Sequence, residues 1–129
     1  MTHRKCGLVA GILFLAVALM PVAAVAGPLE DGMDAHKSGD YATALRLWRP
    51  LAEQGHADAQ FALGFMLEHG QGALRDRVQA HMLYSLAASR SPPGEDHDTA
   101  VRYRDTVASQ MTPAQITEAQ KLALEWRPK

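Results

Sequence analysis

The chain has 129 residues, of which 47% are hydrophobic and 21% are charged, and its formal net charge at pH 7 is −1. This length supports one domain, and the near-neutral charge gives no electrostatic reason to expect a nucleic acid partner. The single cysteine, Cys6, precedes an apolar run instead of following it, so an acylated lipoprotein cysteine is not expected. Beyond that run the sequence has no disulfide, thiol nucleophile or thiolate metal site.

Residues 1–26 have the features of a secretory signal peptide. They comprise a basic start at residues 3–5, an apolar run over residues 7–20 and a small-x-small sequence at residues 24–26. We therefore predict cleavage after this sequence and export of residues 27–129 to the periplasm or beyond, with no membrane contact afterwards. The alternative is an uncleaved membrane anchor, because the segment has about the 20 residues that a span requires.

The first part of the mature chain predicts a helix pair. The helical pattern over residues 29–37 is weak, but its start is acidic, as the positive end of a helix dipole favours. A turn at residues 38–40 begins a second helix, and Gly55 is placed to cap its end. Pro50 lies within this second helix; because the apolar stripe continues past it, we expect a kinked helix, and the alternative is a helix that ends at Arg49. The stripe consists of Ala44, Leu47, Trp48, Leu51 and Ala52.

Residues 57–89 predict a second helix pair joined by a glycine-bearing loop. Gly64 interrupts the apolar stripe of the first helix. Since a helical glycine costs about 1 kcal/mol relative to alanine, we expect another helix backbone to cross closely there. In the second helix, small residues alternate with large ones, as tight helix packing requires. The two stripes consist of Ala59, Ala62, Leu63 and Met66, and of Ala80, Leu83, Tyr84, Ala87 and Ala88.

The two predicted helix pairs repeat each other. Moving back 36 residues from Tyr84 gives Trp48, and the same offset holds along the whole apolar stripe of the second helices. In the first helices the offset is 32, from Gly64 to Gly32, and the four missing residues fit the longer loop at residues 70–75. An internal period in this range indicates stacked helix pairs, each of which buries its apolar face against the next.

The small, aromatic and loop positions of the second pair carry a family resemblance: Ala59, Leu63, Gly64, Gly70, Gln71, Gly72, Asp76, Ala80, Tyr84, Ala87 and Ala88. At these positions the chain resembles the Sel-1-like repeat, a longer-looped relative of the tetratricopeptide repeat. Residues 32–52 are similar to a shorter, tetratricopeptide-style unit with a degenerate first helix. The resemblance covers about residues 29–89, and it implies an α-solenoid that binds other proteins and carries no catalytic residues.

Beyond a loop that contains two prolines, about residues 96–127 predict a third helix pair that caps the solenoid. Asp96 or Asp98 is expected to cap a helix that runs through about Gln110. Residues 112–115 combine Thr, Pro and Gln in the pattern of a capping box, which predicts the start of the last helix. A repeat array needs such an end, because an unstacked terminal pair leaves its apolar side in water.

The sequence offers little for catalysis. Glu68 and His69 with His81 are the nearest approach to a metal site, but there is no H-E-x-x-H motif, so we expect no metal and no cofactor. Ser85 and Ser89 lack a spacing that argues for a nearby base. We therefore predict that the protein is not an enzyme.

A surface is the better functional candidate. By the resemblance, the first helix of each pair lines the concave side of the solenoid, and two aromatic residues one helical turn apart lie there beside charged residues. The alternative for both phenylalanines is that they pack against a neighbouring pair. The predicted partner-binding residues are Asp58, Phe61, Phe65, Glu68 and His69.

Together these patterns predict an all-α solenoid of about three antiparallel helix pairs. We expect an exported adaptor or regulatory subunit that binds another protein or a peptide through its concave face. Two alternatives stay open, namely a small cell-envelope enzyme of the hydrolase type and a structural or oligomerising subunit. The exported Sel-1-like proteins linked with hydrolase activity have cysteine-bridged repeats, which this sequence lacks.

Overall fold

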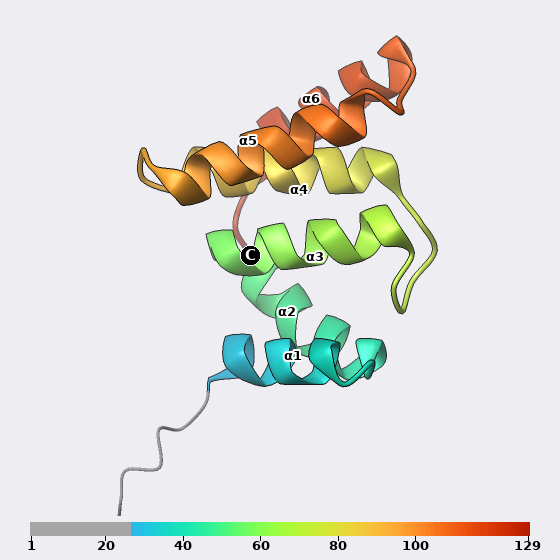
Figure 1. Cartoon of the computed structure of the whole chain (residues 1–129). Helices are drawn as coiled ribbons and strands as arrows, with labels where there is room; N and C mark the ends of the chain where they lie inside the picture. The colour runs from blue at the N-terminus through green and yellow to red at the C-terminus, as the bar shows by residue number, and fades with distance from the viewer. Residues whose placement is uncertain (1–26) are drawn as a thin grey trace, which may run out of the picture.

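The computed structural model describes residues 27–129, and this part of the chain is helical throughout, without a strand (Figure 1). The expected signal sequence lies outside the described residues. Among residues 27–129, none of the helices has the length and apolar character that crossing a membrane requires. Their bounds are α1 (Pro28–Lys37), α2 (Tyr41–Glu53), α3 (Ala57–His69), α4 (Arg77–Arg90), α5 (Glu95–Ala108) and α6 (Pro113–Glu125).

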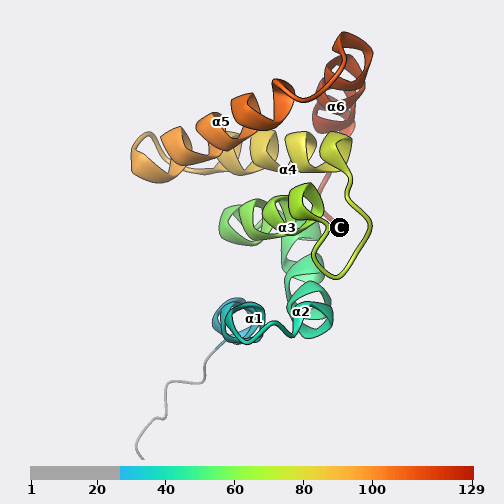
Figure 2. The same cartoon turned by 45° about the vertical axis from the view of Figure 1, so that its right-hand side comes forward.

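Helices that follow each other from α1 to α5 pack against each other, which confirms the predicted helical solenoid. The first helices of the pairs, α1, α3 and α5, run in the same direction and lie one above the other, while α4 runs back between α3 and α5 (Figure 1). Turned by 45°, the same helices show α1 and α5 on one side of the molecule and α2 and α6 on the other (Figure 2).

In each repeat, one glycine of the first helix packs against one aromatic ring of the second helix. A Cβ atom added to Gly32 would lie 2.2 Å from Nε1 of Trp48, and one added to Gly64 would lie 3.1 Å from Cε1 of Tyr84. Both rings are buried. The expectation that Gly64 marks a close helix approach is therefore confirmed, and the same device holds the first pair together.

Helix ends in the two repeats are also equivalent. Asp40 caps α2 by accepting a hydrogen bond from the backbone N–H of Thr43 at 3.2 Å, and Asp76 caps α4 through Gln79 at 3.0 Å. These bonds satisfy backbone donors that a helix start leaves free. Helix α2 continues through Pro50 to Glu53, as the unbroken apolar stripe indicated.

The principal core lies between α2, α3 and α4. Because α4 is covered on several sides, it buries more residues than any other helix and holds the two repeats and the C-terminal helices together. Side chains of α6 and the residue after it, Leu122, Ala123 and Trp126, close the core from outside. The buried core residues are Ala44, Leu45, Trp48, Ala52, Ala59, Leu63, Met66, Met82, Leu83 and Leu86.

The start of α5 differs from the expectation that Asp96 or Asp98 caps it. Gly94 is the N-cap residue, with φ at 152° and no side-chain cap, so the helix begins before either aspartate and ends at Ala108. Glycine allows this backbone geometry, and both aspartates become residues of the first helical turn instead. The predicted capping box of α6 is confirmed, since Thr112 and Gln115 exchange both hydrogen bonds.

The third helix pair is more open than an antiparallel hairpin. Helix α6 packs on α4 and makes no comparable contact with α5, because its apolar face is used to cover the principal core. The chain end then returns toward α3 (Figure 1). There the backbone N–H of Lys129 donates to the Glu53 carbonyl at 2.9 Å, and Trp126 lies 4.6 Å from the Arg90 guanidinium carbon.

We expect Gly64→Leu to destabilise the fold by about 1–3 kcal/mol, the usual cost of overpacking, because its side chain has no room between α3 and Tyr84. Gly64→Ala is the control, since its Cβ contact is only tight and removing a helical glycine returns about 1 kcal/mol. Thermal unfolding followed by circular dichroism measures both. Equal melting temperatures for Gly64→Leu and wild type would contradict the close approach.

Candidate protein-binding groove

A cavity of about 450 Å³ opens along the face formed by α1, α3 and α5. These helices pack on the intervening α2 and α4 instead of on each other, which leaves space between them. The volume falls in the range of about 300–1,000 Å³ that is typical of ligand pockets. We call this cavity the groove; its lining consists of Leu29, Met33, His36, Lys37, Trp48, Ala57, Asp58, Phe61, Ala62, Phe65, Ala87, Ser91, Asp96, Thr99 and Ala100.

The wall of the groove that α1 and α2 form is fixed by polar contacts at its edges. The indole N–H of Trp48 donates to the Leu29 carbonyl at 3.0 Å, and His36 Nε2 donates to Gln71 Oε1 at 2.7 Å. Met33 stands in this wall with 45% of its surface exposed. The wall is therefore rigid at its base and carries one flexible apolar side chain at its rim.

Two phenylalanines of α3 form the middle of the groove, and they differ in their surroundings. Phe61 packs on Tyr84 and Tyr103, at centroid distances of 5.4 and 5.0 Å, and touches the apolar clusters between α4 and α5. Phe65 stacks instead on His69, at 4.2 Å, and approaches His36 at 6.0 Å. Both phenylalanines are half-buried, but Phe61 packs into the apolar clusters between α4 and α5, whereas Phe65 lies mainly among the histidines at the groove and reaches Tyr103 only at 6.3 Å.

Three of the five predicted partner-binding residues, Asp58, Phe61 and Phe65, line the groove together. The other two lie beside it. Glu68 accepts a hydrogen bond from the Tyr84 hydroxyl at 2.5 Å, and burial together with this bond raises the pKa of Tyr84. His69 is exposed at the end of α3, where its Nδ1 donates to the Phe65 carbonyl at 2.9 Å.

Sequence patterns missed the parts of the groove that α1 and α5 contribute. The weak helical pattern of α1 gave no reason to place Met33 or His36 on a functional face. Asp96 was expected at a helix cap or in a solvated loop, but the early start of α5 turns it into the groove. Asp58 is the second residue of α3, as Asp96 is of α5. This equivalence is the one signal in the sequence that points to Asp96.

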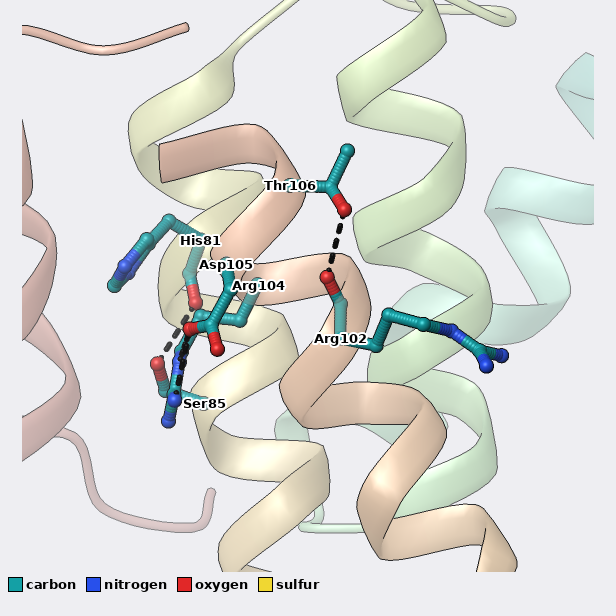
Figure 3. Close-up of polar contacts among 6 residues, drawn as sticks. All are labelled: His81, Ser85, Arg102, Arg104, Asp105 and Thr106. Carbon is teal, nitrogen blue, oxygen red and sulfur yellow. Dashed lines mark hydrogen bonds and ion pairs between the residues drawn. The ribbon is translucent and has the colours of Figure 1, made fainter. Parts of the chain in front are cut away.

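Apart from the groove, a polar cluster lies between α4 and α5, where His81 is 4% exposed (Figure 3). Burial and then the charge of Arg104 lower the pKa of His81, and Asp105, 2.9 Å from Arg104, partly opposes them. The surroundings of His81 thus disfavour its charged form. Within residues 27–129, no three His, Cys, Asp or Glu side chains are grouped so that they could hold a metal ion.

The Sel1 repeat model matches the chain twice, at residues 29–56 and 57–92. These matches coincide with the α1–α2 and α3–α4 pairs. The α1 helix, expected to be degenerate, is a regular helix of 10 residues, and all of it except Pro28 lies in the first match. No solved structure is significantly similar to the chain.

Curated relatives match over the same region. Protein sel-1 homolog 2 of Mus musculus is 43% identical over 54 residues, which are 41% of this chain and 8% of that protein. DAP3-binding cell death enhancer 1 of Rattus norvegicus is 39% identical over 49 residues, 38% of this chain and 10% of that protein. The exopolysaccharide production negative regulator of Rhizobium leguminosarum bv. viciae is 32% identical over 68 residues, 53% of this chain and 26% of that protein.

The chain therefore spans about a quarter or less of the length of these relatives. Their similarity to this chain concerns the repeats and not the whole proteins. Two matched repeats, an all-helical solenoid and a glycine–aromatic contact inside each pair agree with one another. The chain belongs to the Sel1 repeat family, whose repeats are protein-interaction modules.

Proposed function

We propose that the protein is an exported adaptor or regulatory subunit that binds another protein or a peptide in the groove, and that it has no catalytic activity of its own. The observation that carries this proposal is the groove itself, an apolar cavity on the face formed by the first helices of successive pairs, with two aromatic side chains of α3 at its middle. Apolar surface left in water is unfavourable, so a cavity of this kind gains free energy when a partner covers it.

The composition of the groove supports a protein partner. Its middle is aromatic and aliphatic, while charged side chains such as Lys37, Asp58 and Asp96 stand at its margin. An apolar centre with a polar rim is the usual anatomy of a protein–protein interface. The rigid base around Trp48 also favours binding, since a preformed surface loses less conformational freedom when a partner docks.

The names of two relatives agree with a binding and regulatory role. One is called a DAP3-binding protein and another a negative regulator of exopolysaccharide production. Each name describes a much longer protein. The names support interaction as the mode of action without identifying a partner for this chain.

Binding and stability should separate on α3. We expect Phe65→Ala to abolish partner capture with only a small loss of melting temperature, because Phe65 is half-buried at the groove and is not part of the buried core. Leu63→Ala should instead lower the melting temperature, since removing a buried leucine costs about 2–5 kcal/mol. The measurement is affinity capture from the exported fraction, with captured proteins identified by mass spectrometry, beside thermal unfolding of each variant.

The matched control for Phe65→Ala is Leu124→Ala, which removes an apolar side chain that is 80% exposed on α6, away from the groove. A partner of the groove is captured by wild type and by Leu124→Ala, and is lost from Phe65→Ala. If Phe65→Ala captures the same proteins as wild type, the groove is not the binding surface. If Phe65→Ala melts as early as Leu63→Ala, Phe65 is a core residue.

Export is proposed from the signal-like pattern of residues 1–26. We expect the exported protein to begin at Gly27, because the small residues at positions 24 and 26 suit a signal peptidase. Intact-mass analysis of the protein recovered from the cell envelope or medium measures the cleavage point. A mass that retains residues 1–26 would instead indicate an anchored protein.

A further inference from the structure

We propose that the natural occupant of the groove is a cationic amphipathic peptide segment, which inserts apolar side chains into the cavity and directs Lys or Arg residues toward Asp58 and Asp96. This inference rests on the proposed function and adds the chemistry of the partner. It is drawn from the distribution of charge around the apolar lining and from the absence of internal partners for the two carboxylates.

Asp58 and Asp96 occupy equivalent positions in parallel helices. Each is the second residue of its helix, α3 or α5, and each is exposed and lines the same cavity. Within residues 27–129, neither carboxylate forms an ion pair or a side-chain hydrogen bond. Two carboxylates beside one apolar cavity thus remain available to a basic ligand.

Negative charge is concentrated at one edge of the groove. The first turns of α1, α3 and α5 lie at one edge of the molecule (Figure 1), and this edge also carries the exposed Glu30, Asp31 and Glu95. The only Lys or Arg in the groove lining, Lys37, is the last residue of α1 and lies at the opposite edge. A bound segment is therefore oriented, with its basic residues at the edge where the three helices begin.

The apolar part of the groove excludes a purely polar ligand. Alanines at positions 57, 62, 87 and 100 make room between the larger side chains, and exposed Met33 can adapt to the shape that enters. Exposed ion pairs alone bring little affinity, and complementary charge mainly selects the partner and its orientation. Apolar insertion and basic flanks are therefore required together.

Three short synthetic peptides of equal length test this chemistry against the exported protein by fluorescence anisotropy. One alternates leucines with lysines in an amphipathic pattern, the second has glutamate for every lysine, and the third has serine for every leucine. We expect the leucine–lysine peptide to bind at least about tenfold more tightly than either of the others, because it alone carries both the apolar side chains and the positive charges that the groove requires.

A pair of double variants separates the groove from general attraction to an acidic protein. Residues 27–129 have 14 acidic and 11 basic side chains, because two of the 13 basic residues, Arg4 and Lys5, precede them. Asp58→Asn with Asp96→Asn should bring the leucine–lysine and leucine–glutamate peptides close to equal affinity. Glu118→Gln with Glu125→Gln changes the net charge equally on exposed positions of α6 and should leave the preference intact.

Several results would overturn the proposal. They are equal or tighter binding of the glutamate peptide, equal binding of the serine–lysine peptide, and a lysine preference that survives loss of Asp58 and Asp96. Failure of all three peptides, while partner capture still depends on Phe65, would refute the cationic partner and leave the proposed function standing. A dimer that Phe65→Ala dissociates would assign the groove to a second copy of the chain.

Discussion

The contact between a glycine on one helix and an aromatic ring on the next sets the geometry of both repeats. Gly32 faces Trp48 and Gly64 faces Tyr84, so each ring occupies the space that a side chain on the first helix would fill. The two rings are also held by polar bonds, from Trp48 to the Leu29 carbonyl and from Tyr84 to Glu68. Because a fixed ring at a glycine allows close helix approach, each pair is tight and its apolar stripe is directed toward the neighbouring pair.

The groove follows from this close packing within pairs. When α1 is held against α2 and α3 against α4, the second helices separate the first helices from one another. The space that remains between the first helices is lined mainly by side chains of α1, α3 and α5. The parallel direction of these helices then places their acidic first turns at one edge. The apolar cavity and its charged margin are therefore consequences of the repeat geometry together with a few side chains.

Local sequence patterns predicted the parts of this structure that depend on neighbouring residues. The capping box at Thr112, the continuous helix through Pro50 and the role of Gly64 could all be derived from spacing. The packing of α6 on α4 could not, because the cover that Leu122 and Trp126 give to the principal core depends on where a distant helix docks. For the same reason, the sequence indicated the α3 part of the groove and missed its walls on α1 and α5.

The central claim is that the groove between α1, α3 and α5 is where the partner binds. Nitrogen–proton correlation NMR spectra of the exported protein, recorded with and without a captured partner or a bound peptide, test it most directly. We predict that the largest shift changes fall on the groove residues, including Met33, Phe65 and Thr99, while those of exposed α6 residues such as Leu124 stay small. Changes concentrated on α6, with α1, α3 and α5 unaffected, would contradict a binding groove on this face.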